Sequence, residues 1–309
     1  MRIFVTGASG FIGGAVARAF ARRGHEVRGL TRGETRNPGL RVDGVIPVTG
    51  DLNSPESVLA LAARSEVFVH CAHEYSAEAV ARDNAAIDIM LALAKQGGPR
   101  GLVYTSGVWV YGNCCHDGID SVDEASPLDP LALVGWRPSH EARILEAAGG
   151  AVRAVVIRPG CVYGGAGSLT GNWFASALKE GAAVVAGDGR NRWAMVHLDD
   201  LADLYVRAAE REVSGVFNGS GVGGVVAEMA AAAAVAAGAS GRIKVLDADK
   251  AREMYGPLAE GLMVSQAVRR GRAERLLDWH PRHRGFAENA AVHFASWRAA
   301  QNGEGKIGF

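Results

Sequence analysis

The 309-residue chain lacks an excess of charge, a long apolar run and a cysteine-rich framework. Lys and Arg number 33, as do Asp and Glu, so a nucleic acid or an anionic membrane has no electrostatic reason to bind. The most apolar stretch, Met229–Ala239, is mostly alanine and shorter than the roughly 20 residues that a membrane-spanning helix needs. The first residues, MRIFVTGASG, lack the features of a signal peptide. We therefore expect no nucleic-acid partner and no membrane span.

The cysteines are too few and wrongly spaced for a disulfide scaffold or a zinc site. They are Cys71, Cys114, Cys115 and Cys161, and none lies in a C-x-x-C pair. We interpret the adjacent Cys114 and Cys115 as reduced loop thiols. The sequence therefore predicts a reducing, cytoplasmic compartment and no metal.

Short β-branched runs alternate with helical patterns in the first half of the chain, which indicates β-α-β crossovers and a parallel sheet. The predicted strands are RIFVTG, HEVRGLTR, GVIPVTG, EVFVHCAH, GLVYTSG and AVVIRPG, at residues 2–7, 25–32, 44–50, 66–73, 101–107 and 154–160. Beyond Gly164 turns are more frequent, and helices are expected near the C-terminus. We predict an α/β fold: a Rossmann-type doubly wound parallel sheet in residues 1–164, and a smaller substrate-binding lobe in residues 165–309 that is partly interleaved with it.

A glycine motif directly follows the first predicted strand and opens a helix. In VTGASGFIGG, the spacing of Gly7, Gly10 and Gly13 is G-x-x-G-x-x-G. The first glycine permits a tight turn, the second lets the backbone approach a pyrophosphate, and the third lets the helix pack on the strand. The anion would lie on free N–H groups at the helix N-terminus. The predicted dinucleotide contacts here are Gly7, Ser9, Gly10, Phe11, Ile12 and Gly13.

The tip of the second predicted strand favours NADP over NAD. An acidic residue there would bind the adenosine ribose, but the tip carries Thr31 and Arg32, followed by Arg36. A guanidinium suits a 2′-phosphate because it offers two parallel hydrogen bonds. NAD stays the alternative, and Asp51 and Leu52 are expected at the edge of the adenine.

With its other motifs, the chain resembles the extended short-chain dehydrogenase/reductase family, the NAD-dependent epimerase/dehydratase group. The motifs are TGASGFIG, GDL at 50–52, YTSGVWVYG from Tyr104, DEASPLDP from Asp123, IRPGCVYG from Ile157, GDGRNRWAMVHLDDLA from Gly187 and AERLLDWHPRH near the C-terminus. The resemblance implies a nicotinamide dinucleotide cofactor. It adds Cys71, Ala72, Thr105, His140, Pro159 and Cys161 to the expected cofactor contacts.

The resemblance also shows where the chain departs from the family. Members usually work through a Ser or Thr, a Tyr and, four residues later, a Lys. Here Gly107, Trp136 and His140 occupy those positions, so the chain resembles the atypical members that lack the Tyr-x-x-x-Lys pair. Ser106, one residue before Gly107, is a candidate for the lost hydroxyl.

Trp136 and His140 lie one helical turn apart, so both face the same side. Trp136 does not titrate and is expected to wall the substrate pocket, whereas His140 suits either proton transfer or binding of the nicotinamide ribose. Pro138 between them predicts the first turn of a helix. The expected pocket also includes His73, Gly107, Tyr163 and Arg192, and a loop with His116 and Asp117 is expected to overhang it. Tyr163 also suits a position in the core. His197 is expected at the junction of the two lobes.

These residues leave several functions open. The first is an NADPH-dependent oxidoreductase that reduces a conjugated or aromatic small molecule, such as an enone, a quinone or a polyketide-like compound. The alternatives are a non-redox isomerase, cyclase or dehydratase, an NADP-binding redox sensor, and a nucleotide-sugar epimerase. The resemblance also implies a homodimer, paired through the helices around residues 77–95 and 139–148.

Overall fold

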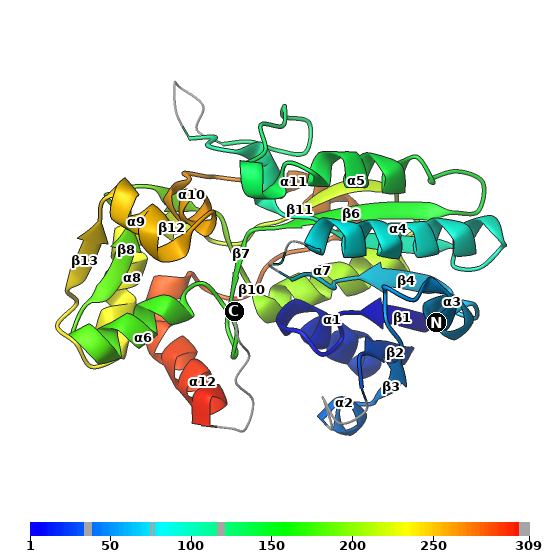
Figure 1. The fold of residues 1–309 in the computed structure, drawn as a ribbon, viewed down its shortest axis with the longest axis horizontal. Helices are drawn as coiled ribbons and strands as arrows, with labels where there is room; N and C mark the ends of the chain where they lie inside the picture. The colour runs from blue at the N-terminus through cyan, green and yellow to red at the C-terminus, as the bar shows by residue number, and fades with distance from the viewer. Residues whose placement is uncertain (34–38, 75, 77, 116–120, 303–309) are drawn as a thin grey trace.

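The computed structural model describes residues 1–33, 39–74, 76, 78–115 and 121–302, which form two lobes lying side by side (Figure 1). The larger lobe is built on a central sheet with helices on both faces. The smaller lobe contains mainly helices and short strand pairs. The predicted α/β class is confirmed.

The central sheet has seven parallel strands in the order β11-β6-β5-β4-β1-β2-β3. Its strands are β1 Arg2–Thr6, β2 Glu26–Thr31, β3 Val45–Thr49, β4 Val67–His70, β5 Gly101–Thr105, β6 Arg153–Pro159 and β11 Gly215–Gly219. The inner strand β4 is buried along its whole length, as expected for a parallel strand covered on both faces. The six strands predicted in the first half are all present. Strand β11, from the sequence GVFNG, was missed because its short run is rich in glycine.

Helices cover both faces of this sheet. One face carries α1 Phe11–Arg22, α7 Leu198–Glu210 and α11 Gly271–Leu277, and the other carries α3 Pro55–Ala62, α4 Ala79–Lys95 and α5 Arg137–Leu145. Short turns of helix are α2 Gly39–Val42, η2 Val108–Tyr111 and η3 Ala132–Val134. Because α7, β11 and α11 come from beyond residue 164, the C-terminal half of the chain contributes to both lobes.

The smaller lobe has its own apolar core of aromatic and alanine side chains. It contains α6 Gly171–Glu180, β8 Ala183–Ala186, β9 Arg192–Trp193, β12 Gly224–Val225, α8 Val226–Ala236, β13 Ile243–Leu246, α9 Ala248–Tyr255, α10 Leu258–Met263, η4 Phe286–Asn289 and α12 Ala290–Asn302. The parallel pair β7 Cys161–Tyr163 and β10 Met195–His197 runs between the lobes (Figure 1).

None of the four cysteines, all of which lie in the described part of the chain, forms a disulfide, which agrees with the prediction of reduced thiols for Cys114 and Cys115. In the described part of the chain, no helix has the length and apolarity to cross a bilayer.

Candidate active site

The glycine loop between β1 and α1 has the geometry of a dinucleotide cradle. Gly7 has φ +70°, and a Cβ there would lie 2.7 Å from the backbone of Ala72. A Cβ on Gly13 would lie 2.2 Å from the Gly7 carbonyl oxygen, so neither position accepts a side chain. Gly10 is exposed, and a Cβ there would meet only that oxygen, at 3.2 Å. The loop is therefore packed tightly against the protein at Gly7 and Gly13, whereas its backbone is accessible to a ligand at Gly10.

The first turn of α1 is also suited to an anion. Gly10 is its N-cap, no side chain caps the helix, and the first turn contains no acidic residue. The first N–H groups of a helix lack intrahelical acceptors, so a pyrophosphate can take them. Ser9 is exposed on this loop, whereas Phe11 and Ile12 pack partly against the core of the larger lobe. These residues fit the cofactor that the sequence predicts.

The sequence predicts the adenosine end of the cofactor site at the tip of β2. The hydroxyl of Thr31 is buried and has no hydrogen-bond partner in the described part of the chain. Arg32 is exposed and forms no ion pair with a described carboxylate, whereas Arg36 lies outside the described residues. Asp51 accepts a hydrogen bond from the Asn53 N–H at 2.9 Å, which fixes the loop after β3 next to the half-buried Leu52. Arg32 is close enough to Glu74 to help lower the pKa of that carboxyl. A buried hydroxyl and an exposed guanidinium that have no hydrogen-bond partner among the described residues suit a phosphorylated ribose.

At the carboxyl ends of β4 and β5, Thr105 joins several groups together. Its hydroxyl donates to the His70 carbonyl at 2.6 Å and contacts Cys71 Sγ at 3.4 Å and Tyr205 Oη at 2.7 Å. Burial raises the pKa of the Cys71 thiol to about 12, so this cysteine is not a nucleophile. Ala72 donates its N–H to the Thr6 hydroxyl at 3.4 Å. The hydroxyl of Thr105 therefore already has hydrogen-bond partners within the protein.

Pro159 and Cys161 flank the crossing from the sheet to the smaller lobe. Pro159 ends β6 and is buried, and Cys161 opens β7. Burial raises the pKa of the Cys161 thiol to about 12. Both lie at or just after the carboxyl end of β6, the side of an open α/β sheet at which ligands bind, and their predicted cofactor contacts stay predictions.

The central finding is that Asp83, a residue the sequence analysis missed, joins His140 to His70. Asp83 lies on α4 and is 4% exposed. Its Oδ2 is 2.6 Å from His140 Nδ1 and accepts the Tyr104 hydroxyl at 2.8 Å, and its Oδ1 is 3.2 Å from His70 Nε2. His70 Nδ1 is in turn 2.6 Å from the Thr6 hydroxyl. A buried chain of polar groups thus runs from the glycine loop to His140.

The charge on Asp83 decides which ring nitrogen of each histidine carries hydrogen. Burial alone would raise the pKa of this carboxyl, but hydrogen bonds from His140, His70 and Tyr104 outweigh burial and hold the pKa well below its usual range. An ionised carboxylate only accepts hydrogen bonds, so His140 Nδ1 and His70 Nε2 must both carry hydrogen. His140 is thereby left with Nε2 as its reactive nitrogen, and no described residue hydrogen-bonds to it.

Trp136 covers His140 from the open side. The indole and imidazole rings meet edge to face, with centroids 4.8 Å apart, and the centroid of the His73 ring lies 6.3 Å from that of the indole. Helix α5 begins at Arg137 with Pro138 in its first turn, which confirms the predicted helix start. Trp136 therefore contacts His140 and lies near His73, whose pKa is lowered to about 4 by burial of its ring and by the nearby Arg137.

The predicted hydroxyl position is open. Gly107 has extended backbone, and a Cβ there would meet nothing within 4 Å. The neighbouring Ser106 Oγ is buried and has no partner in the described part of the chain. A buried hydroxyl without a partner is costly, so Ser106 suits hydrogen bonding to a bound molecule.

The other predicted pocket residues lie apart from this cluster. Tyr163 is 1% exposed and donates its hydroxyl to the Arg284 carbonyl at 2.8 Å, which places it in the packing between the lobes. Arg192 is exposed on β9 and forms no ion pair with a described carboxylate. His116 and Asp117 lie outside the described residues. His197 caps α7 at the junction of the lobes, as expected.

One group of described residues has metal-type ligands close together. His197, Asp199 and His283 have donor atoms within 4.8 Å of one another. However, His197 Nδ1 already accepts the Asp199 N–H at 3.2 Å, and the two imidazoles stack 3.6 Å apart. Stacked rings direct their nitrogen lone pairs along parallel planes rather than toward one ion. The cluster is better described as packing, and the expectation of no metal stays a prediction.

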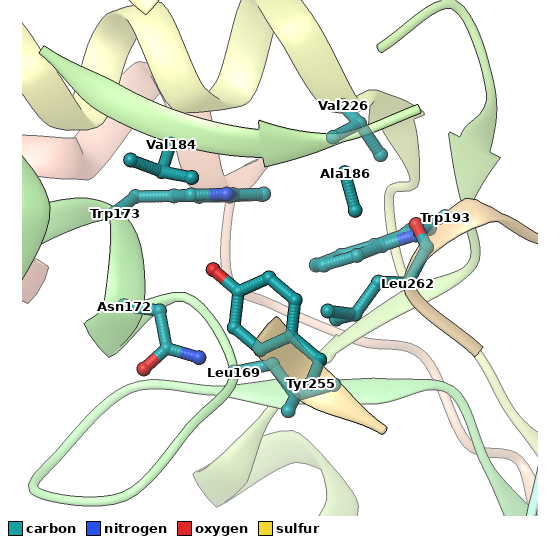
Figure 2. Close-up of a pocket in the computed structure, with 9 residues that line it drawn as sticks. All are labelled: Leu169, Asn172, Trp173, Val184, Ala186, Trp193, Val226, Tyr255 and Leu262. Carbon is teal, nitrogen blue, oxygen red and sulfur yellow. The ribbon is translucent and has the colours of Figure 1, made fainter. Parts of the chain in front are cut away.

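A separate small pocket lies in the smaller lobe (Figure 2). Its wall contains Trp173 and Trp193, whose rings stack with centroids 5.1 Å apart. Asn172 and Tyr255 are the polar side chains labelled around it, and no charged side chain lines it. The pocket shares no residue with the Asp83 cluster.

The comparison with known families agrees with the Rossmann-type fold described above. The sequence profile of the NAD dependent epimerase/dehydratase family matches residues 3–219, so the protein belongs to this family. It is an NAD(P)-dependent enzyme of the oxidoreductase type.

Among its relatives, an uncharacterized protein of Schizosaccharomyces pombe is 30% identical over 294 residues, which cover 92% of this chain and 96% of the relative. The 2-alkyl-3-oxoalkanoate reductase of Stenotrophomonas maltophilia is 29% identical over 225 residues, which cover 68% of this chain and 66% of the reductase. The chain thus spans just under two thirds of that reductase.

Solved structures share the fold at lower identity. The UDP-glucose 4-epimerase of Thermotoga maritima has a TM-score of 0.82 and 19% identity, over 97% of this chain and 100% of the epimerase. The dTDP-glucose 4,6-dehydratase of Streptomyces venezuelae, solved with NAD bound, has a TM-score of 0.80 and 21% identity, over 96% and 97% of the two chains. At these identities the likeness establishes the fold.

Proposed function

We propose that the protein is an NADPH-dependent reductase of a conjugated carbonyl compound, such as an enone or a quinone, in which His140 held by Asp83 handles the proton. The observation that carries the proposal is the 2.6 Å contact between His140 Nδ1 and Asp83 Oδ2. A histidine oriented by a buried carboxylate keeps one nitrogen in a fixed direction and is stabilised as the imidazolium. The family's tyrosine and lysine are absent, so this pair is the best acid–base system at the site.

NADPH, held by the glycine loop, would supply the hydride for this reduction. The protein residues then have three tasks. His140 delivers one proton from Nε2 toward the oxygen on which negative charge develops, and it regains that proton from solvent. Asp83 stabilises the imidazolium before the transfer and keeps hydrogen on Nδ1 of the neutral ring after it, and Trp136 provides a flat wall against a conjugated acceptor. Conjugate reduction suits this set of residues because delocalised charge needs a weaker acid than an isolated alkoxide does.

The relatives support carbonyl chemistry. Their names include a 2-alkyl-3-oxoalkanoate reductase, a quinoline-oxide ketoreductase of Stigmatella aurantiaca and a 2'-dehydrokanamycin reductase of Streptomyces kanamyceticus. A nucleotide-sugar epimerase is the second candidate, favoured by the fold of the solved neighbours. We rank it below the reductase because Trp136 has no hydroxyl with which to move a proton.

The test is consumption of NADPH with a panel of enones, quinones and nucleotide sugars. Loss of absorbance of the reduced cofactor with an enone or quinone supports the reductase. Conversion of a nucleotide sugar without net consumption supports the epimerase, and another product without net consumption supports an isomerase, cyclase or dehydratase. Tight NADPH binding with no product from any compound supports a redox sensor and contradicts the proposal.

We also propose a homodimer paired through α4 and α5. The outer side of this helix pair carries Arg143, which bonds Asn84 at 2.8 Å and Asp88 at 2.5 Å. A dimer formed here would therefore have a polar rim. A monomeric mass by light scattering at micromolar concentration would refute it.

A further inference from the structure

Arg137 is a buried cation at the edge of the candidate active site. It is the first residue of α5 and is 7% exposed. Its Nη1 donates to the Thr105 carbonyl oxygen at 2.9 Å, at the end of β5. Its guanidinium lies 4.8 Å from the centre of the Trp136 ring. The cation is therefore fixed between the end of the sheet and the wall of the pocket.

The guanidinium has no charge partner among the described residues. Two buried carboxylates lie nearby, on α4 and on α5, and both already have other partners. Asp83 bonds His140, His70 and Tyr104. Glu141 accepts hydrogen bonds from Nε and Nη2 of Arg158 at 3.0 and 2.5 Å. Thr105 is the one hydrogen-bond acceptor of the Arg137 side chain among the described residues, and no nitrogen of Arg137 belongs to the fully buried atoms that lack a partner, so its remaining N–H groups reach solvent and are open to a ligand. Its neighbour Arg158, on the same face of the sheet, is fully paired.

An unpaired buried charge is costly, and a protein normally pairs or removes it. Arg137 bonds the carbonyl of Thr105, and the next residue, Ser106, carries a buried hydroxyl without a partner among the described residues, which points to one ligand that completes both. Its planar fork matches two oxygens of one carboxylate, and Trp136 beside it matches an adjoining flat group.

We infer that Arg137 is the substrate-recognition residue of this site and that it binds a carboxylate. This inference rests on the proposed function for the rest of the substrate, which would then be a conjugated or aromatic oxo acid. The carboxylate lies on the guanidinium, the conjugated part lies against Trp136, and Ser106 donates to one oxygen of the ligand. Neutral enones of the same shape are poorer ligands because they leave the cation unpaired.

The test uses benzoate and benzamide as probes, with the complete protein saturated with NADP⁺ and titrated by calorimetry. Benzoate should bind about 10- to 100-fold more tightly than benzamide, which is the usual worth of a charge-assisted hydrogen bond. Arg137→Met should abolish that preference, and Arg137→Lys should retain part of it. Arg143→Met, on the same helix but paired with Asn84 and Asp88, should leave it unchanged.

Thermal unfolding shows whether Arg137 serves to bind a ligand or to stabilise the folded protein. If Arg137 serves a ligand at the cost of stability, Arg137→Met should unfold at the same or a higher temperature than the parent. Equal affinity of the parent for the two probes, including no measurable binding of either, overturns the inference. So does a preference for benzoate that survives in Arg137→Met. Because no turnover is measured, an inactive enzyme with an intact preference for benzoate would contradict the proposed reductase and leave the carboxylate site standing.

Discussion

His140 and Asp83 are 57 positions apart in the chain, yet their side chains meet at 2.6 Å in the buried layer between α5 and α4. The contact gives a histidine in the lysine position a carboxylate partner. It also sets the tautomer, because the carboxylate requires hydrogen on Nδ1. Nε2 is then the only nitrogen of His140 available to a ligand.

Replacing either member of this pair should lower turnover. His140→Ala and Asp83→Asn should each reduce kcat by roughly 10²–10⁴-fold, because the proton donor or the support of its cation is lost. Asp88→Asn, on the exposed side of the same helix, is the matched control and should retain activity. The pH profile of kcat should lose one titration in His140→Ala. If His140 only binds the ribose, its variant weakens NADPH binding while kcat at saturation is unchanged.

The aromatic wall should affect substrate binding more than chemistry. Trp136→Phe keeps a flat surface over His140 and should retain most activity, whereas Trp136→Ala should raise KM with a smaller effect on kcat. Steady-state kinetics with one accepted enone measures both constants. A fall in kcat alone in Trp136→Ala would assign the indole to the proton step.

Gly10 and Gly13 should respond differently to substitution. Gly10→Val places a branched side chain on the open side of the cradle and should abolish NADPH binding in a folded protein. Gly13→Ala forces a methyl group against the Gly7 carbonyl at 2.2 Å, so it should lower the unfolding temperature as well. Calorimetric titration and thermal unfolding of both variants separate the effects. Unchanged affinity in a folded Gly10→Val protein would show that the loop is only a turn.

Cofactor preference should depend on Arg32. NADPH should bind more tightly than NADH, and Arg32→Ala should narrow the difference by about ten-fold or more, the worth of one charge-assisted phosphate contact of about 1.5–3 kcal/mol. Equal titration curves of the parent for the two cofactors would contradict this prediction. Arg28→Ala, within β2 and paired with Glu26, is the control.

The histidines at the junction of the lobes should make stability depend on pH. Burial, together with the nearby His197 and His283, lowers the pKa of His293 to about 4 from 6.5. The unfolded chain therefore binds a proton between about pH 6.5 and pH 4 that the folded chain does not, so stability should fall by up to about 3 kcal/mol as the pH drops through this window. His293→Phe should flatten the curve of unfolding free energy there. A dependence that persists in this variant would assign it to other groups.

The local pattern of the sequence was sufficient for the fold and the cofactor loop. Alternation of short apolar runs with helical segments predicted six of the seven strands, and the spacing of Gly7, Gly10 and Gly13 predicted the cradle that the structure shows. Both depend on neighbours in the chain: the period of a strand or helix and the sterics of a turn are local properties. Strand β11 was not predicted because its short, glycine-containing run shows no distinct periodicity of apolar residues.

The candidate site was determined by the sequence only in part. His140, Trp136, Ser106 and Gly107 were found because the family motif aligns them. Asp83 was missed, although it shares a spacing with the buried Ala86, Ile87 and Met90, and an acid on the apolar stripe of a helix is a signal of a buried partner. Which partner it meets depends on how α4 and α5 pack on the sheet. The same packing leaves Arg137 without a described carboxylate while Arg158 receives Glu141. Such ion pairs join residues that are distant in the chain. A buried charge is stabilised by the groups that surround it in space, and only the tertiary structure decides which groups those are.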